Sequence, residues 1–259
     1  MPAEIFTQQV RRSRAASGVM GVSLGAFAFF ALAITKSLSA FLDDITASFP
    51  EALKAFVGAG SPGGYVVGET FALIGPIALV AYAVMVGASA LAGEERDGTM
   101  ALLSAQPVSR SRVLAAKAGG MATSLATVAV LFWVGMALAL VLFPSSDIGA
   151  GALAAGVLHL LFLALAFGSV AFAVGAGTGR PSVAAGAAGG LAVVAYLTQT
   201  MLPLAGLGGW APLSPWHYAM SSDPLRNGVD IANLCVLAGI AVGGLAVGAL
   251  GFSHRDLRG

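Results

Sequence analysis

Charged residues are scarce in this sequence, and their scarcity limits what the protein can be. Asp, Glu, Lys and Arg make up 10% of the 259 residues, whereas 58% are hydrophobic and the mean hydropathy is +0.88. A soluble domain carries about 25% charged residues, which keep its surface hydrated. Most of the surface of this protein must instead face lipid, so we exclude a soluble fold and predict an integral membrane protein.

Cysteines and metal-binding patterns are also nearly absent. Cys235 is the single cysteine and lies in an apolar run, which excludes an internal disulfide and is typical of a small buried residue in a helix. The histidines are scattered, and no His-Glu pair has metal-ligand spacing. We expect no metal site and no catalytic residue in this chain. The net charge of +1 gives no indication of a nucleic-acid partner.

The chain also lacks the phosphate-binding loop of ATPases, Gly-x-x-x-x-Gly-Lys-Ser/Thr. Lys36-Ser37 is the one place where Lys precedes Ser or Thr, and no suitable glycines come before it. The segment 175–182 has glycines, but at the wrong spacing and with Arg180 in place of lysine. That pattern is typical of a tight turn. We therefore expect no ATP hydrolysis by this chain.

Six apolar stretches are long enough to cross a membrane as helices. The apolar core of a bilayer is about 30 Å thick and needs about 20 helical residues. Unpaired strands would leave backbone groups unsatisfied in lipid, so helices are favoured. The stretches cover about 16–35, 66–92, 116–143, 150–177, 182–206 and 230–252. We interpret residues 1–259 as one all-α transmembrane domain.

The distribution of Lys and Arg predicts that both termini are cytoplasmic, because cytoplasmic segments of membrane proteins are enriched in these residues. Ten of them lie in the two termini and in the second and fourth connections: Arg11, Arg12, Arg14, Arg96, Arg110, Arg112, Lys117, Arg180, Arg255 and Arg258. The other side carries Lys36, Lys54 and Arg226. An even number of spans puts both termini on the same side, which agrees with this count.

Glycine pairs spaced four residues apart recur in the predicted spans. They are Gly21/Gly25, Gly186/Gly190, Gly239/Gly243 and Gly244/Gly248. Small residues at this spacing let helix backbones approach closely in lipid. We expect these pairs to pack helices within a compact bundle, with a specific dimer contact as the alternative.

The N-terminal segment 4–13 has two interpretations. Its apolar residues Ile5, Phe6 and Val10 lie among polar residues, with arginines at its end. This pattern fits a short helix in the membrane interface beside anionic headgroups. It equally fits the positively charged residues that ordinarily precede a first span. The apolar run 19–34 is long enough to span and lacks a good cleavage site, so we interpret it as a retained span.

The connection 93–115 is the most informative stretch. A charged run leaves the second span, and Gly98 interrupts it. Thr99 is then placed to cap a short helix that Pro107 stops, and Ser109 is a candidate cap for the next helix. Met100, Leu102 and Leu103 would be exposed on the short helix. Exposed apolar residues of this kind are typical of a helix that docks into a groove of a partner protein. A solvated loop would explain the charges at 94–97 but not these apolar residues.

This connection closely resembles the first cytoplasmic loop of the permeases of type 2 ABC exporters. The matching features, in order, are Glu94-Glu95, Gly98-Thr99, Leu102-Leu103, Pro107, Ser109-Arg110 and Lys117. A weaker resemblance lies in the last external connection, where Leu-Ser-Pro-Trp-His-Tyr at 213–218 and Asp-Pro-Leu at 223–225 are similar to a Ser-Pro-aromatic segment of such permeases. With the six spans, the resemblance covers nearly the whole chain.

The resemblance implies a permease subunit that a separate ATP-binding cassette subunit drives, with ATP and Mg²⁺ bound in that partner. The short helix would be the coupling helix, and a second permease subunit, in a homodimer or heterodimer, would complete the pathway. The segment 4–13 would be an interfacial connecting helix, and the last external connection a partial re-entrant structure. The residues implied in partner binding are Glu94, Glu95, Arg96, Asp97, Thr99, Met100, Leu102, Leu103 and Pro107.

Three polar residues in or near the spans are candidates for the pathway. Glu69 begins the second span, and His159 lies about a third of the way into the fourth. Ionisable residues in spans are costly and often functional, although a neutral His159 could simply bond a neighbouring helix. Gln199 is a polar residue in the fifth span; its side chain could line a cavity or form a hydrogen bond with a neighbouring helix.

Two other functions stay open at this level. An ion-coupled secondary transporter would need charged groups or broken helices at mid-membrane, and this chain offers few. A permease-like subunit that transmits ATP-driven force to an extracytoplasmic partner would carry the same coupling loop. Apolar Gly/Ala-rich spans favour a hydrophobic or amphipathic cargo, and the composition favours a prokaryotic inner membrane.

Overall fold

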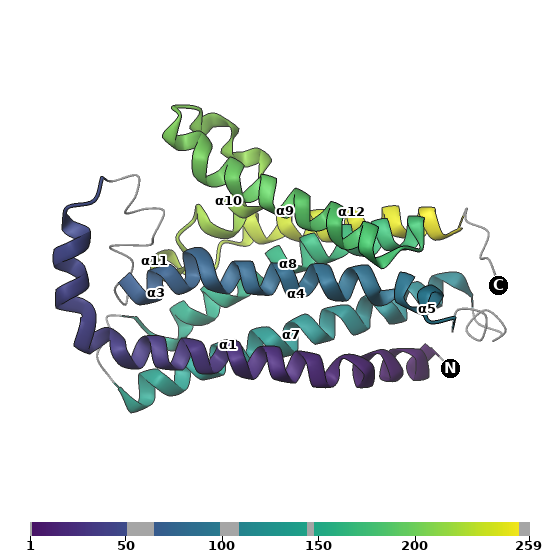
Figure 1. Ribbon diagram of the computed structural model, residues 1–259, viewed down its shortest axis with the longest axis horizontal. Helices are drawn as coiled ribbons and strands as arrows, with labels where there is room; N and C mark the ends of the chain where they lie inside the picture. The colour runs from purple at the N-terminus through teal and green to yellow at the C-terminus, as the bar shows by residue number, and fades with distance from the viewer. Residues whose placement is uncertain (1, 51–64, 99–108, 144–147, 254–259) are drawn as a thin grey trace.

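Long helices that run nearly parallel form most of the structure (Figure 1). The computed structural model describes residues 2–50, 65–98, 109–143 and 148–253, and these contain no strand. The elements are α1 (Pro2–Ala47), α3 (Tyr65–Glu69), the π-helical turn η1 (Thr70–Ile74), α4 (Gly75–Ala90), α5 (Ala92–Arg96), α7 (Arg110–Leu142), α8 (Ala150–Thr178), α9 (Pro181–Leu204), the 3-10 helix η2 (Gly208–Leu213), α10 (Pro215–Met220), α11 (Pro224–Asn227) and α12 (Ile231–Ser253).

The six predicted spans are confirmed as six helical segments long and apolar enough to cross a membrane. Four of them begin and end close to the predicted residues. The second span differs because it contains the π-helical turn η1, where the Gly75 N–H donates to the Thr70 carbonyl. Pro76 follows and has no N–H to donate, which accounts for the irregular turn at this point.

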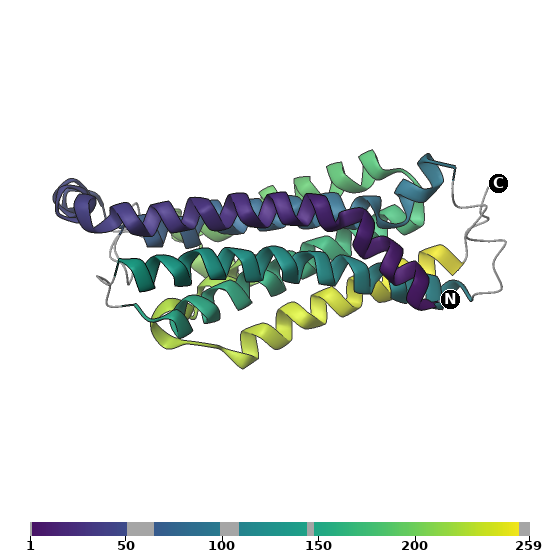
Figure 2. The same ribbon diagram turned by 90° about the horizontal axis from the view of Figure 1, so that it is seen from below.

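The first span differs most from its predicted range of 16–35, because α1 is one helix of 46 residues. The segment 4–13 is therefore continuous with the first span and is not a separate helix; its position in the membrane interface stays a prediction. Figure 2 shows that the N-terminal part of α1 is turned away from the axis of the rest. Ile5 of this part is buried, because the segment packs on the first turns of α7.

Both described ends of the chain lie at one end of the bundle (Figures 1 and 2). We call this the terminal end. Helix α5, the start of α7 and the turn at Gly179 and Arg180 also lie there, as alternating helices require. The C-terminal ends of α1, α7 and α9 lie toward the opposite end.

Helix α8 lies at the centre of the bundle, and α4, α7, α9 and α12 pack around it. Its side chains Leu153, Leu163 and Phe167 are almost fully buried. Close contact with α4 depends on Gly87, where an added Cβ would overlap the Gly168 carbonyl. Helices α9 and α12 are the least covered: the most apolar windows of these two helices are 22% and 17% buried.

The glycine pairs divide into two groups. A Cβ on Gly21 or Gly25 of α1 would collide with α7, and one on Gly244 or Gly248 would collide with Ser169 and with the Phe172–Ala173 part of α8. These pairs pack helices within the chain, as expected. In contrast, a Cβ on Gly186, Gly190, Gly239 or Gly243 would meet no atom within 4 Å. Cys235, expected to be buried, also faces outward.

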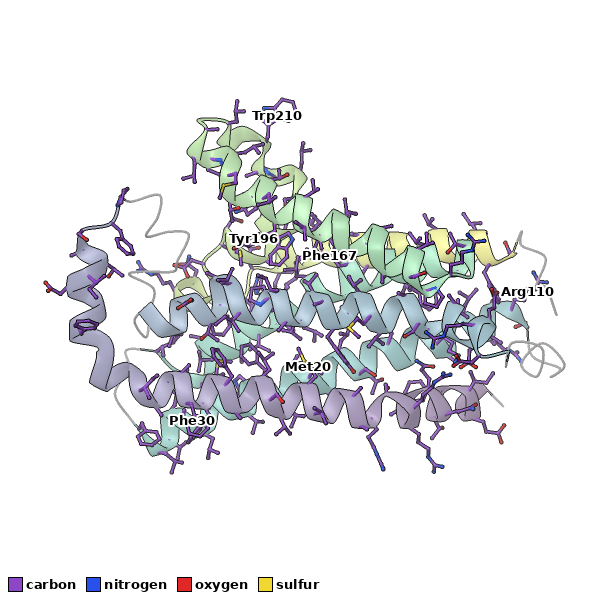
Figure 3. The ribbon with its side chains drawn as sticks, viewed as in Figure 1. Met20, Phe30, Arg110, Phe167, Tyr196 and Trp210 are labelled. Atoms are coloured by element: carbon purple, nitrogen blue, oxygen red, sulfur yellow. The ribbon has the colours of Figure 1, made fainter. Side chains whose placement is uncertain are left out.

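The connection between α9 and α12 folds back onto the bundle around Trp216, which is 2% exposed. The Trp216 indole N–H donates to the Ala192 carbonyl at 3.2 Å, and the Ser214 hydroxyl donates to the Ala195 carbonyl at 2.7 Å. The Trp216 ring also contacts the rings of Phe167 and Tyr196. Figure 3 shows Phe167 and Tyr196 close together at the base of the α9–α10 arm, with Trp210 at its tip.

Candidate functional site: a buried ion cluster

The short helix α5 leads from the second span into the connection that the sequence singled out. Leu91 departs from regular helical geometry and separates α5 from α4. Gly98 has φ +71°, a left-handed conformation that glycine adopts readily and that ends a helix. Gly98 therefore ends the charged run, as predicted. The chain resumes at Ser109, which occupies the N-cap position of α7, although its side chain makes no cap hydrogen bond.

Glu94 of α5 and Lys117 of α7 form a buried ion pair. The Lys117 Nζ donates to the Glu94 Oε1 at 2.6 Å, and the two side chains are 4% and 9% exposed. Water screens such a pair little, so its electrostatic attraction is stronger than that of a surface pair. Removing one partner of a buried pair leaves an uncompensated charge and costs about 3–5 kcal/mol. The pair therefore fixes α5 to α7.

Helix α1 joins the same cluster through two side chains. The Gln9 Oε1 accepts a hydrogen bond from the Lys117 Nζ at 2.9 Å. The Arg12 Nη1 donates to the Glu94 Oε1 at 3.0 Å. Helices α5 and α7 and the distant helix α1 thus meet at one carboxylate and one ammonium group.

Asp97 extends the cluster to its exposed edge. Arg12 pairs with Asp97 through Nη2, and the Arg96 Nε lies 3.1 Å from the Asp97 Oδ1. These guanidinium groups, Arg12 first, hold the pKa of Asp97 below its usual range. Asp97 is therefore ionised at neutral pH and holds the last residues of α5 against α1.

Small residues let α1 and α7 approach closely beside the cluster. A Cβ on Gly120 would collide with the Gln9 side chain. One turn further along, the Ser124 hydroxyl donates to the Ser13 hydroxyl at 2.6 Å. These contacts fix the register of α1 and α7 at this end.

A cavity of about 530 Å³ lies next to the cluster, between α1, α4, α5 and α9. Arg12 and Arg96 line it on the cluster side, and Tyr82, Met85 and Ser182 line it elsewhere. The cavity thus combines charged, hydroxyl and apolar surfaces at the terminal end. Its lining includes the first turn of α9, one of the two least covered spans.

The predicted partner-binding residues differ in how buried they are, and several lie outside the described residues. Glu94 is buried within the cluster, so it is not part of a solvated loop; its partner-binding role stays a prediction. Glu95 is half-buried, and Arg96 and Asp97 are exposed at the edge of the cluster. The other predicted residues, Thr99, Met100, Leu102, Leu103 and Pro107, lie outside the described residues, as does the coupling helix itself. Their partner-binding role stays a prediction.

The predicted pathway residues lie apart from one another. Glu69 is partly exposed at the end of α3. His159 is completely buried: its Nδ1 lies 2.9 Å from the Ala155 carbonyl, so Nδ1 donates, and its Nε2 accepts from the Asp230 N–H at 3.4 Å. His159 thus joins α8 to the start of α12. The Gln199 Oε1 is buried, and it has no hydrogen-bond partner among the described residues. A pathway role for the three stays a prediction.

The sequence analysis missed the central role of Lys117. It counted this residue with the positive charges of the connection, although Lys117 falls just inside the predicted span 116–143. A lysine in a span is costly and needs a partner, and that signal was present. Nothing in the pattern indicated that Gln9 and Arg12, more than 80 residues before their partners, would complete the site.

Comparison with known proteins identifies a family. The family described as ABC-2 family transporter protein matches residues 4–257, which is nearly the whole chain. Among curated proteins, no significant match was found.

Proposed function

Because the chain belongs to the ABC-2 family of transporter proteins, we propose that it is the permease subunit of an ATP-driven exporter. Membership of the family and six membrane-spanning helices make it a multi-pass permease of an ABC transporter. The finer proposal is that a separate ATP-binding cassette subunit drives it and that a second permease subunit completes the pathway. The terminal end then faces the cytoplasm of a prokaryotic cell.

The observation that carries this proposal is the buried Glu94–Lys117 pair. The connection 99–108 is attached to α5 on one side and to α7 on the other, and the pair fixes these two helices to each other. Arg12 and Gln9 add α1 to the same unit. A force applied to this connection by a partner therefore acts on three helices at once, because a shift of any one of them breaks the buried Glu94–Lys117 pair or the contacts of Gln9 and Arg12 with it.

The charge distribution supports a cytoplasmic position for the terminal end. Arg11, Arg12, Arg14, Arg110, Arg112 and Arg180 all belong to described segments there. Positive residues are enriched on the cytoplasmic side of membrane proteins, and an ATP-binding subunit requires cytoplasmic ATP. The cavity beside the cluster would then be open to the cytoplasmic leaflet, in the position where a permease would receive an amphipathic cargo.

Affinity purification from the native membrane in mild detergent tests the proposal. We expect an ATP-binding subunit to co-purify with the tagged wild-type chain. Leu103→Asp, in the predicted coupling helix, and Glu95→Arg should abolish partner-dependent ATP turnover while the bundle stays folded. Arg180→Gln, at the same end of the bundle but in another connection, is the control and should retain the partner. A chain that purifies alone, under conditions that preserve other complexes, would contradict the proposal and favour an ion-coupled transporter.

A further inference from the structure

Three arginines lie within four residues of α1, and the structure separates them into two groups. Arg12 faces α5, where it pairs with Glu94 and Asp97. Arg11 and Arg14 are exposed, and within the described part of the chain neither side chain forms an ion pair or a hydrogen bond. Because an α-helix has 3.6 residues per turn, Arg11 and Arg14 lie on one face, away from Arg12.

The side chains that follow these two arginines on the same face are apolar and exposed. Ala15, Val19 and Val22 occupy it, and the two valines are 70% and 60% exposed. Among the described elements α1 packs mainly on α7, and Figure 1 shows α1 along one edge of the bundle. The surface therefore changes from cationic to apolar within about two turns. We call this surface, from Arg11 to Val22, the outer face of α1.

The two arginines lie at the level where the apolar core of a membrane begins. No charged residue lies between Arg14 and Lys36, and at 1.5 Å per residue these positions are about 33 Å apart along the helix. The apolar core of a bilayer is about 30 Å thick. Helix α7 gives the same level, because Lys117, which donates to Gln9, directly precedes the uncharged stretch of that helix. The unpaired arginines therefore lie among the lipid headgroups.

The charge of the outer face selects among ligands. Like charges three or four residues apart on a helix repel each other, so an anion between Arg11 and Arg14 removes an unfavourable interaction. Glu4, the acid of the same segment, lies about two turns further from the apolar part of the face. An acidic protein surface would also supply an anion. The exposed valines directly beside the arginines favour a lipid, because one lipid molecule supplies both a phosphate and an acyl chain.

We propose that the outer face of α1 binds an anionic phospholipid of the leaflet at the terminal end. The phosphate lies between the guanidinium groups of Arg11 and Arg14, and an acyl chain lies on Val19 and Val22. Arg12, on the other side of the same turn, stays in the ion cluster. The lipid therefore contacts this turn of α1 from outside, while the cluster holds it from inside. The site is separate from the proposed function and does not depend on an ATP-binding partner.

A comparison of two lipids tests the recognition of charge. The purified full-length chain is titrated in neutral detergent with phosphatidylglycerol and with phosphatidylcholine of the same acyl chains, and native mass spectrometry measures the bound lipid. We expect the wild type to bind phosphatidylglycerol more tightly. Arg11→Gln combined with Arg14→Gln should weaken phosphatidylglycerol binding about 25-fold, about fivefold for each interfacial arginine, and leave phosphatidylcholine binding unchanged. Both side chains are exposed, so this variant should fold like the wild type.

Two further variants separate a site from a general effect of positive charge. Arg11→Lys combined with Arg14→Lys keeps both charges and should retain most of the preference for phosphatidylglycerol. Arg180→Gln removes a cation at the same end of the bundle but outside α1, and it should bind phosphatidylglycerol like the wild type. Equal binding of the two lipids by the wild type would overturn the proposal. So would an Arg180→Gln variant that loses as much affinity as the double glutamine variant.

A polar side chain in the apolar part of the face tests the position of the acyl chain. Val22→Asn should weaken the binding of phosphatidylglycerol. Val193→Asn on α9, where the valine is also 60% exposed, is the matched control and should not. Equal effects of the two substitutions would contradict an acyl chain on α1. A double glutamine variant that keeps its lipid but loses a protein partner or changes its oligomeric state would assign the face to a protein and overturn the proposal.

Discussion

The Lys117 ammonium group lies 2.6 Å from the Glu94 carboxylate, and both side chains are buried. The pair joins the two helices between which the connection 99–108 runs. Arg12 and Gln9 of α1 bind the same two residues. The function that we propose depends on this arrangement, because it joins the helices on either side of the connection, α5 and α7, to each other and to α1.

Breaking the pair should destabilise the protein strongly. In Lys117→Met the Glu94 carboxylate keeps Arg12 but loses its buried ammonium partner. We expect unfolding free energy to fall by about 3–5 kcal/mol, the usual effect of removing one member of a buried pair. Unfolding in a denaturing detergent, followed by tryptophan fluorescence, measures the change.

A double-mutant cycle measures the interaction energy between Glu94 and Lys117 separately from their other contacts. Lys117→Met combined with Glu94→Gln leaves no unpaired buried charge, so we expect the double variant to lose less than the sum of the single losses. Arg96→Gln is the control, because the Arg96–Asp97 pair is exposed and should contribute about 0–1 kcal/mol. Strict additivity of the two single effects would contradict a direct Glu94–Lys117 interaction.

The close approach of α1 and α7 should depend on Gly135. An added Cβ there would overlap the Gly25 backbone, so Gly135→Ala must push the helices apart. We expect a loss of about 1–3 kcal/mol, as for other overpacked positions. Gly186→Ala is the matched control, because no atom lies within 4 Å of its added Cβ. Thermal unfolding of the two variants in the same detergent compares them, and equal melting temperatures would contradict the helix contact.

Trp216 should anchor the connection between α9 and α12. In Trp216→Ala the ring contacts with Phe167 and Tyr196 and the hydrogen bond to Ala192 are lost. We expect a stability loss of about 3–5 kcal/mol, as for other large-to-small changes in a core. Trp210→Ala, at a site where the side chain is 58% exposed, should change stability by about 0.5 kcal/mol or less. Similar losses in both variants would show that the connection is not anchored at Trp216.

The stabilising effect of Asp97 should depend on pH in one direction. Arg12 and Arg96 lower the pKa of Asp97 in the folded protein. A lowered pKa stabilises the folded state above the unfolded pKa, about 3.9, and this stabilisation is lost as pH falls through the folded pKa. Asp97→Asn should therefore be less stable than the wild type at pH 7, and the difference should shrink below about pH 4. A difference that grows on acidification would contradict the ion pairing.

Hydropathy and length were sufficient to predict the six spans, because a lipid-facing helix needs apolar residues along its whole length. They did not predict where α1 would begin and end. No proline lies between Pro2 and Pro50, and a change from apolar to polar residues does not stop a helix. The π-helical turn at Thr70–Ile74 depends on how Pro76 interrupts the backbone hydrogen bonds, which hydropathy does not record.

The candidate site was predictable in position but not in composition. The charged run and Gly98 pointed to the segment in which the ion cluster lies, since both are local features. The sequence could not show that Glu94 would turn inward, because its partners are 23 and 82 residues away. The glycine pairs illustrate the same limit. Gly21/Gly25 and Gly186/Gly190 have the same spacing, yet only the first pair meets another helix.

The central claim is that the ion cluster transmits movement from an ATP-binding partner to the spans. The most direct measurement is ATP turnover of the partner co-purified with wild-type chain and with Lys117→Met, both in lipid nanodiscs at matched stoichiometry. We expect Lys117→Met to retain the partner but to lose the permease-dependent part of the turnover, whereas Arg180→Gln behaves like the wild type. Full permease-dependent turnover with a folded Lys117→Met variant would contradict the account.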